Sequence, residues 1–564
     1  MTSLHQFDVV SFVSEKFAKA GIRVAEITVR DYPEESIVVV RVGEADFQGA
    51  IPLANAIDGQ LSDRGFHGFV TIKKAAAPSR TALFQARINS LSDDRVTSLV
   101  HLLTARSRTT EMQPSLSYIP DVKNNIASAT SSRHHLIFGR RGSGKTALLA
   151  ETKRLVEADG ALTIWLNIQT YRHESAGRIF LMVAQKVCEL IQGRYRGSRQ
   201  SPMVVRTANA VYDQIQAELA SSTLDTTLLH RMIPRMQALI RRFVETEENS
   251  LYIFLDDFYY LDKREQPQLL DMVHGCVRDC DAWLKIATIQ HLTRWFDPRR
   301  NLGLQSGHDA AHIDLDITLQ DPRAAKVFLE KVLLSYAQHS GIVAISHVFS
   351  QSGALDRLVL ASGAVPRDYL TLCSSSIQQA QRRPNAKFVG VQDVNKAAGD
   401  VKQKKLDELE DDATSAEGES QDALHALQVV RRFCIDDRSW TYFRVDIREK
   451  ETRMEDYGRL QLLTDLRLVH LIDPGVSEEH RAGHRSEVYM LDLSQYAEHR
   501  LKRKLSVLDF VDGHFVLKRT GTHIRPRIGD TANKRLNLLR RAPLLPLERL
   551  TVSPASDGPF RRRR

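Results

Sequence analysis

The chain has 564 residues, of which 42% are hydrophobic and 26% are charged, and its formal net charge is +9. It is long enough for roughly three or four domains with their own cores, and its composition is that of an ordinary soluble globular protein. No apolar run reaches the roughly 18 residues of a membrane span, the N-terminus lacks a secretory pattern, and five scattered cysteines suggest no disulfide framework. We therefore predict a cytoplasmic protein without membrane association.

The positive charge is concentrated at the C-terminal end. From Leu501 onward there are 16 Lys and Arg against five Asp and Glu, so this segment alone carries +11. Charge asymmetry of this kind favours a polyanion partner. We predict a basic tail over residues 501–564 that contacts DNA phosphates without sequence preference. A solvated tail, or one that binds an acidic partner, is the alternative.

The first 75 residues have the pattern of a small α+β module. Two stretches with helical spacing, 7–20 and 47–64, alternate with three β-rich runs. The segment contains no phosphate loop, metal-binding cluster or catalytic pair. We therefore expect a docking or regulatory module that binds a partner protein or a second copy of the chain. Residues 76–114 follow as a linker and helical connector.

Residues 139–147 are the stretch around which the chain is organised. They fit G-x-x-x-x-G-K-[ST], follow a short apolar strand and open a helix, as a phosphate loop requires. Backbone N–H groups of such a loop and the N-terminus of the next helix bind phosphates. We predict that ATP binds here, with Lys145 on its β and γ phosphates and the Thr146 hydroxyl on Mg²⁺. The predicted cofactor-binding residues are Gly139, Arg140, Arg141, Gly142, Ser143, Gly144, Lys145, Thr146 and Ala147.

A second site element is the apolar run 251–255, which ends in Asp256 and Asp257. Five apolar residues running into acids are typical of a buried parallel strand that ends at a metal site. We predict that Asp256 holds Mg²⁺ and that Asp257 orients or deprotonates the attacking water.

The next apolar strand, 284–290, has polar residues at its end, and three arginines lie in the loop after it. Thr288 or Gln290 at its end is placed to sense the γ-phosphate, with a structural role as the alternative; of the two, Gln290 is the predicted catalytic residue. The loop after it carries three arginines, one of which is a candidate for reaching a neighbouring subunit's nucleotide: Arg294, Arg299 and Arg300.

Residues 321–406 are predicted to be helical without strands. Gly363 ends one helix and Pro366 starts the next, so Arg367 lies at a helix start and can reach the phosphates from a separate lid. A simple helix junction is the alternative. Before the phosphate loop, Tyr118 and Ile119 are candidates for packing on the base, with core packing as the alternative.

Residues from about 115 to 405 resemble a P-loop ATPase of the AAA+ type with its helical lid. The resemblance is closest to the origin-recognition and helicase-loader ATPases and the related signal-transduction (STAND) ATPases. It rests on Gly139 to Thr146, on Asp256-Asp257, on the polar strand end and on Gly363-x-x-Pro366-Arg367. One departure is that AAA+ enzymes usually carry Asp-Glu where this chain has Asp-Asp, as STAND proteins commonly do. The resemblance therefore implies slow, switch-like hydrolysis.

The remaining segments complete the predicted fold. Residues 407–420 form a charged linker, and 421–500 resemble the winged-helix domain that follows the lid in the origin-recognition group. Its basic residues (Arg459, Arg481, His484 and Arg485) are mixed with acids, so DNA contact and protein docking are both open. The predicted class is α/β: a P-loop parallel sheet (115–320) with an α-helical lid (321–406), a small N-terminal α+β domain and a C-terminal winged-helix domain.

The predicted function is an ATP-hydrolysing, Mg²⁺-dependent AAA+/STAND-type ATPase. In this prediction its nucleotide state drives self-assembly or a conformational change on DNA, in a bacterial DNA-transaction or anti-phage defence system. The alternative is a STAND-like signalling switch that binds protein partners, hydrolyses slowly and has no DNA role. Lys145, Asp256, Asp257, Gln290 and Arg367 are the predicted catalytic residues.

Overall fold

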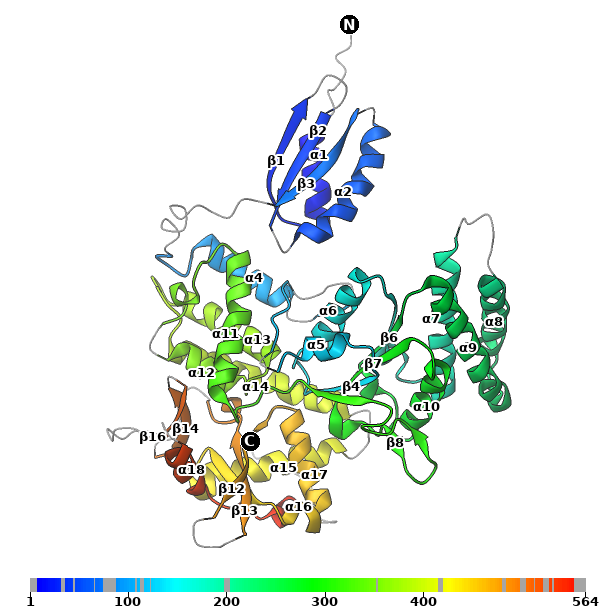
Figure 1. Ribbon diagram of the computed structural model, residues 1–564. Helices are drawn as coiled ribbons and strands as arrows, with labels where there is room; N and C mark the ends of the chain where they lie inside the picture. The colour runs from blue at the N-terminus through cyan, green and yellow to red at the C-terminus, as the bar shows by residue number, and fades with distance from the viewer. Residues whose placement is uncertain are drawn as a thin grey trace, which may run out of the picture. The chain divides into compact units, whose positions relative to one another are not determined.

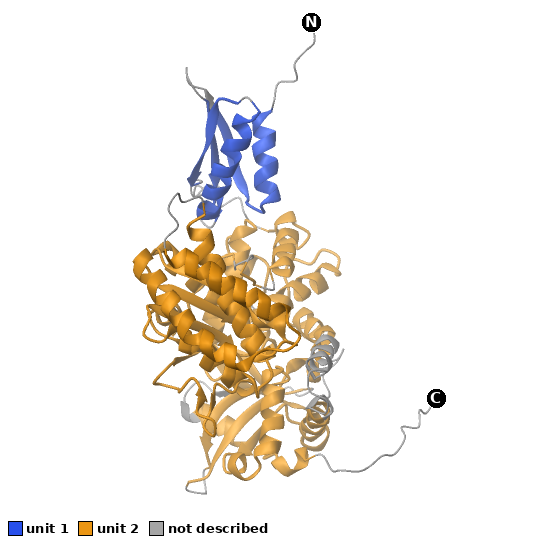
Figure 2. Cartoon of the chain, turned by 90° about the vertical axis from the view of Figure 1, so that its right-hand side faces the viewer, with its two compact units in different colours: residues 1–87 blue, residues 88–564 orange. Residues whose placement is uncertain are grey.

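A computed structural model describes residues 8–31, 36–43, 46–64, 66–74, 88–106, 109–111, 116–121, 123–196, 203–350, 353–413, 419–478, 483–497, 504–511, 513–520, 527–529 and 532–551. The chain divides into two compact units, residues 1–87 and 88–564 (Figure 2). Among the described residues, no helix combines the length and apolar character needed to cross a bilayer.

The first unit is a three-stranded sheet with two helices. Strand β1 is antiparallel to β2, and β2 is parallel to β3, so β2 lies in the centre. Alternate β2 side chains, Val38, Val40 and Val42, are buried in one core with residues of both helices. The elements are α1 (Val9–Lys19), β1 (Val24–Asp31), β2 (Ser36–Val42), α2 (Phe47–Ser62) and β3 (Gly68–Lys74).

A parallel five-stranded sheet forms the centre of the second unit, which confirms the predicted parallel α/β sheet (Figure 1). Its strand order is β10-β4-β7-β6-β5, and every neighbouring pair is parallel. The carboxyl ends of the strands therefore meet at one edge, where Asn167 pairs in register with Asp256. The strands are β4 (His135–Phe138), β5 (Leu162–Asn167), β6 (Leu251–Asp256), β7 (Ala282–Thr288) and β10 (Ala311–Asp314).

Two apolar cores cover this sheet, one on each side. The smaller one includes Leu148 and Leu149 of α6, and the larger one is formed with the three helices inserted between β5 and β6 and with α10. A short hairpin, β8 and β9, follows β7. The helices and hairpin strands are α5 (Asn125–Thr130), α6 (Lys145–Ala158), α7 (Ala176–Arg194), α8 (Met203–Ala220), α9 (Thr226–Glu247), α10 (Gln266–Val277), β8 (Phe296–Asp297) and β9 (Leu302–Gly303).

The predicted lid segment is helical, and a helix from the connector joins it. Helix α4 precedes the sheet in sequence, but its Val96, Leu99 and Leu103 are buried in the same core as the lid helices. The connector therefore contributes to the lid, because its apolar face needs the partners that α11 and α13 supply. The helices are α4 (Asp94–Ala105), α11 (Pro322–His339), α12 (Ala354–Ala361), α13 (Pro366–Gln381) and α14 (Val391–Ala413).

The next segment contains a helix, a strand, two helices and two strands in that order. Its antiparallel sheet has the order β11-β13-β12. Helix α15 continues into a π-helical turn at Arg432–Arg438 before β11 begins. The elements are α15 (Glu419–Arg431), β11 (Tyr442–Asp446), α16 (Glu449–Thr452), α17 (Met454–Asp465), β12 (Val469–Ser477) and β13 (Arg485–Leu491).

The segment expected to be a basic tail is folded over most of its described length. Phe510, Phe515, Leu539 and Leu547 are buried, and Thr441 donates its N–H to the Ser506 carbonyl oxygen. The predicted boundary between a domain ending at residue 500 and a separate tail therefore differs from the structure. The apolar residues between the basic ones complete the C-terminal domain, defined here as residues 419–551. The elements are β14 (Ser506–Val511), β15 (His514–Arg519), β16 (Arg527–Gly529), α18 (Ala532–Arg540) and the 3₁₀ turn η8 (Leu547–Leu550).

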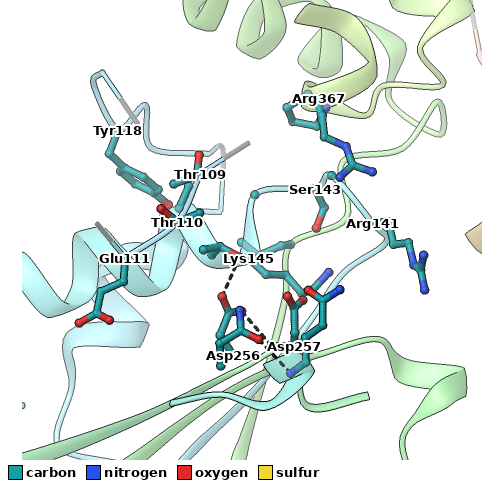
Figure 3. Close-up of a pocket in the computed structure, with 18 of the residues that line it drawn as sticks. Thr109, Thr110, Glu111, Tyr118, Arg141, Ser143, Lys145, Asp256, Asp257 and Arg367 are labelled. Carbon is teal, nitrogen blue, oxygen red and sulfur yellow. Dashed lines mark hydrogen bonds between the residues drawn. The ribbon is translucent and has the colours of Figure 1, made fainter. Parts of the chain in front are cut away.

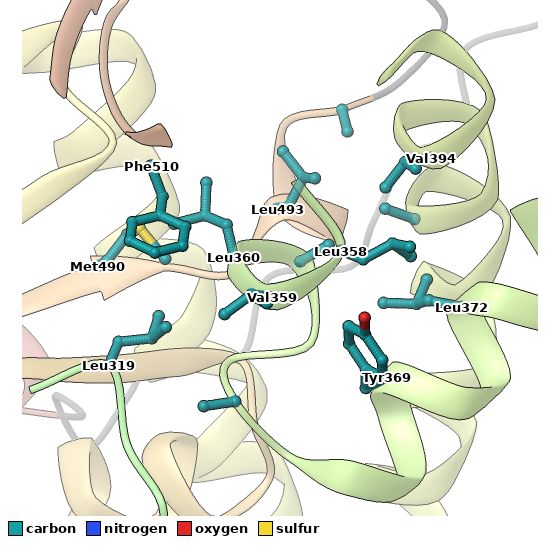
Figure 4. Close-up of a cluster of buried hydrophobic side chains, with 14 of the residues drawn as sticks. Leu319, Leu358, Val359, Leu360, Tyr369, Leu372, Val394, Met490, Leu493 and Phe510 are labelled. Carbon is teal, nitrogen blue, oxygen red and sulfur yellow. The ribbon is translucent and has the colours of Figure 1, made fainter. Parts of the chain in front are cut away.

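The lid and the C-terminal domain share one apolar core. Leu358 and Leu360 of α12 lie in one buried cluster with Met490, Leu493 and Phe510 (Figure 4). Since these side chains are buried jointly, the position of the lid constrains the position of the C-terminal domain.

Candidate functional site

The phosphate loop connects β4 to α6, and the local sequence explains its shape. Leu136, Ile137 and Phe138 are buried and anchor the strand. Gly142 and Gly144 have φ values of +80° and +103°, a region that glycine adopts at low cost. Helix α6 begins at Lys145, so the positive end of its dipole points at the loop.

Lys145 lies inside this loop. Figure 3 shows its side chain among those that line the pocket, and its Nζ donates to the carbonyl oxygens of Gly139 at 2.8 Å and Arg140 at 3.1 Å. Burial lowers the pKa of Lys145, and the carboxylates of Asp257, Asp316 and Asp256 act in the opposite direction. An anionic phosphate beside Nζ would stabilise the charged ammonium in the same way.

Thr146 and Asp256, the two residues predicted to hold Mg²⁺, contact each other. The Thr146 hydroxyl donates to Asp256 Oδ2 at 3.0 Å, and Asp256 is only 1% exposed. Burial, with the neighbouring Asp257 as the second cause, raises the pKa of Asp256 to about 7. A divalent cation would offset the cost of that buried negative charge. Because one carboxylate and one hydroxyl are the oxygen ligands that Mg²⁺ uses together with nucleotide phosphates, these residues fit the ion.

Asp257 follows at the turn out of β6. Its φ is +54°, an uncommon conformation for a non-glycine residue, and its N–H donates to Asp256 Oδ1 at 3.0 Å. The strained turn places Asp257 in the lining of the same pocket as Lys145. The two carboxylates thus occupy different positions, since that of Asp256 accepts a hydrogen bond from Thr146 and Asp257 lines the pocket beside it.

The lid reaches the phosphate loop at the start of α13. The Arg367 N–H donates to the Gly142 carbonyl oxygen at 3.2 Å, and a methyl group on Gly142 would lie 2.8 Å from Arg367 Cβ. Pro366 is the first residue of the helix, where its missing N–H has no partner to lose. Arg367 therefore lies beside the phosphate loop.

One pocket of about 770 Å³ is lined by Lys145, Thr146, Asp256, Asp257 and Arg367. At its lid end the lining is apolar and aromatic, and includes Tyr118 and Ile119, the two predicted base contacts. A planar base packs well on such surfaces, and the volume is that of a typical small-molecule site. The other residues at this end are Leu315, Phe328, Val332, Tyr336 and Leu370.

Several predicted residues do not line the pocket. Gln290 is exposed, because β7 ends at Thr288 and the chain then turns into the 3₁₀ turn η4 (Gln290–Leu292). Thr288 is fully buried, and its hydroxyl bonds that of Thr293. The remaining residues outside the lining are Gly139, Arg140, Arg294, Arg299 and Arg300.

Other residues line the pocket without having been predicted. Asn167 ends β5 beside Asp256, and its position after an apolar strand is a signal that was available in the sequence. Tyr259 and Tyr260, in the 3₁₀ turn η3 (Phe258–Tyr260), carry no such signal, since aromatic residues after a strand are more often part of a core. Others are Arg106, Thr109, Thr110, Glu111, Tyr171 and Arg172.

No family model matches the chain, and no curated protein matches it either. Three solved structures illustrate its likenesses. The Orc1 protein of Aeropyrum pernix, solved in complex with DNA, is 16% identical, with a TM-score of 0.34 over 71% of this chain and 94% of its own. The Walker-type ATPase PABY2304 of Pyrococcus abyssi is 13% identical, with a TM-score of 0.40 over 70% of this chain and 99% of its own. PCH-2 of Caenorhabditis elegans is 13% identical, with a TM-score of 0.25 over 60% of this chain and 78% of its own. Because these TM-scores are low, we derive the function from the chain's own residues.

Proposed function

We propose that the protein is a Mg²⁺-dependent ATPase of the AAA+ type, whose nucleotide state sets the position of its C-terminal domain and which acts on DNA. One observation carries the proposal. A single pocket is lined by Lys145 and Thr146 of the phosphate loop, the carboxylates of Asp256 and Asp257, and Arg367 of the lid. These are the groups that phosphoryl transfer to water requires.

Each residue has a distinct role in this reaction. Lys145 and the loop N–H groups bind the β and γ phosphates, and Thr146 and Asp256 hold Mg²⁺. Asp257 orients the attacking water and accepts its proton as the bond between the γ-phosphorus and ADP breaks. Arg367 binds a phosphate oxygen from the lid. Mg²⁺, when bound, neutralises phosphate charge.

Buried polar contacts support a coupling between nucleotide and C-terminal domain. Asp368, next to Arg367, is partly buried and forms an ion pair with the buried Arg467, which precedes β12. Lys405 of α14 pairs with Asp492 at 3.0 Å, and Asp492 also accepts from His470 at 2.8 Å. Separating a buried pair leaves an unpaired charge, which costs free energy. The contact between the lid and the C-terminal domain is therefore either formed or broken, without stable intermediate positions.

DNA is the proposed partner because of the charge concentrated after residue 500 and because the C-terminal elements follow the order of a winged helix. We further propose that the N-terminal module mediates self-assembly or docking to a partner protein, and that one of Arg294, Arg299 and Arg300 acts across a subunit boundary. All three lie outside the pocket lining, on or beside the β8–β9 hairpin.

A protein-binding switch of the STAND type is the second candidate, and the contacts that α17 makes within its own domain favour it. Arg459 of this helix pairs with Asp422 and Asp456, and η8 contacts the helix. The arginine expected to face DNA is thus used within the domain. Of the arginines expected in the wing, Arg481 lies outside the described residues and Arg485 is exposed.

The test is steady-state ATP hydrolysis by the full chain with Mg²⁺, with and without double-stranded DNA, for the wild type, Asp256→Asn and Asp257→Asn. We expect the wild type to hydrolyse ATP faster when DNA is present. Each substitution should reduce the rate at least about 100-fold. An ATP hydrolysis rate that does not change with DNA would favour the protein-binding switch. Absence of ATP binding would contradict both.

A further inference from the structure

Arg141 is the pocket arginine whose backbone belongs to the phosphate loop. Its guanidinium carbon lies 5.3 Å from the ring centre of Tyr259 and 5.9 Å from that of Tyr260. The centres of the two rings are 4.6 Å apart, and in the sequence a single residue, Phe258, separates Asp257 from Tyr259. All three side chains line the pocket. The guanidinium therefore lies beside the turn that follows the two carboxylates, and Figure 3 shows the Arg141 side chain leaving the phosphate loop.

The charge of Arg141 acts on the groups that surround the phosphates. Lys145 and Asp257 line the same pocket as Arg141. Arg141 therefore lies in the electrostatic field of both the loop lysine and the water-orienting carboxylate. A cation at this place acts on negative charge that develops on the γ-phosphate.

The aromatic pair gives the guanidinium a defined resting place. A guanidinium over the faces of tyrosine rings is held by cation–π attraction, which is weaker than a buried ion pair. Because its Cα is part of the loop that surrounds the phosphates, rotation about its side-chain bonds moves the guanidinium without moving the backbone. Asp257 and the two rings come from one turn, so the same turn positions the carboxylate and the arginine.

We propose that Arg141 is a catalytic residue that acts in cis: its guanidinium binds γ-phosphate oxygens during hydrolysis, in the subunit that binds the ATP. The water oxygen forms a bond to the γ-phosphorus, the bond to the ADP oxygen breaks, and Asp257 takes the proton, so the products are ADP and phosphate. Arg141 stabilises the charge that spreads over the transferred group. This inference rests on the proposed ATPase function.

The first test compares Arg141→Ala and Arg141→Lys with Arg264→Ala, an exposed arginine outside the pocket lining. We expect Arg141→Ala to lower kcat by about 10²- to 10³-fold while ATP affinity stays within a few-fold, because the contact is made in the transition state. The lysine recovers only part of the rate, since an ammonium cannot bind two oxygens in the planar geometry of a guanidinium. Retained ATP affinity shows that the variants are folded. A kcat of Arg141→Ala equal to that of Arg264→Ala would overturn the proposal.

The second test separates action in cis from action in trans. Arg141→Ala is mixed with an equal amount of Lys145→Ala, which removes the loop lysine, and hydrolysis is followed over a range of protein concentrations. Action in cis predicts no recovery of turnover on mixing, whereas recovery would show that Arg141 serves a neighbouring subunit. Lys145→Ala alone serves as the control for the ATPase function. If Lys145→Ala hydrolyses ATP at the wild-type rate, the proposed function is wrong. If Lys145→Ala is inactive but Arg141→Ala hydrolyses ATP at the wild-type rate, the proposed function stands and only the role of Arg141 is wrong.

Discussion

Arg140 of the phosphate loop donates from Nη2 to the Gly363 carbonyl oxygen at 3.3 Å, in the turn between lid helices α12 and α13. The same Nη2 donates to the Ile317 carbonyl oxygen at 2.9 Å, and the Arg140 N–H donates to Asp316 Oδ1 at 2.8 Å. His470 of the C-terminal domain lies on the other side of Gly363. A buried side chain of the phosphate loop is therefore linked, through one turn of the lid, to the C-terminal domain.

Arg140→Met tests this link. Methionine retains much of the side-chain length but donates no hydrogen bond, so the carbonyl oxygens of Gly363 and Ile317 lose a charged donor. We expect a loss of about 1–3 kcal/mol in the stability of the contact between loop and lid. Hydrogen exchange measured with and without ATP should show that ATP no longer changes the protection of β12 and β13. The control is Arg133→Met, since that arginine is exposed and its Nη2 donates to the Gly307 carbonyl oxygen, away from the lid. An unchanged ATP response in Arg140→Met would contradict the link.

Gly363→Ala tests the contact with His470. Gly363 has a φ of +57°, and a methyl group there would overlap the imidazole ring of His470. The ring must move away from Asp492, so we expect a loss of about 1–3 kcal/mol in the free energy of unfolding.

Gly458→Ala is the matched control for that substitution. Gly458 lies inside α17 with open space around it, so alanine should raise stability by about 0.5–1 kcal/mol. Chemical denaturation of the three proteins measures both changes. A Gly363→Ala variant as stable as the wild type would be incompatible with a tight lid contact.

Tyr118→Ala tests the assignment of the base to the lid end of the pocket. Loss of the half-buried ring should weaken ATP binding about tenfold, which corresponds to about 1.4 kcal/mol, whereas Tyr118→Phe retains the ring and should bind like the wild type. Titration with a fluorescent ATP analogue measures both. Equal affinities for the alanine variant and the wild type would place the base elsewhere.

The fold of residues 504–551 determines how the DNA proposal is tested. A chain that ends at Arg500 would lose β14, whose Ser506 pairs with Trp440 and Thr441, so a change in DNA affinity there would reflect damage to the domain. A chain that ends at Thr551 removes Arg561 to Arg564 and leaves the described elements complete. We expect weaker binding to double-stranded DNA and a salt dependence reduced by about 0.9 for each phosphate that the shortened chain no longer neutralises. If affinity and salt dependence both stay the same, these arginines do not contact DNA.

The parts of the candidate site that are encoded locally could be predicted from the sequence. The phosphate loop and Asp256-Asp257 were predicted because each follows a short apolar strand directly, and strand and loop geometry then fix their positions. Gln290 was placed at the end of a strand that in fact stops at Thr288, two residues earlier. A shift of this size at a strand end is enough to turn a side chain out of the pocket.

The long-range contacts were beyond such reasoning. Nothing in the motif indicates that Arg140, one residue into the loop, faces the lid, because its acceptors are carbonyl oxygens about 180 and 220 residues away. The C-terminal segment was predicted to be a tail from its charge, yet its buried Phe510 and Leu539 decide its fold. Net charge describes partners better than it describes folding.

Whether ATP is hydrolysed in this pocket is tested most directly by ATP binding and hydrolysis in Lys145→Ala, with Lys263→Ala as the control at an exposed position outside the pocket lining. Calorimetric titration gives the affinity, and release of phosphate gives the rate, both with Mg²⁺ and the full chain. We predict that the wild type and Lys263→Ala bind and hydrolyse ATP, and that Lys145→Ala loses hydrolysis by about 100-fold or more. Hydrolysis in Lys145→Ala at the wild-type rate would contradict the assignment of this pocket as the ATPase site.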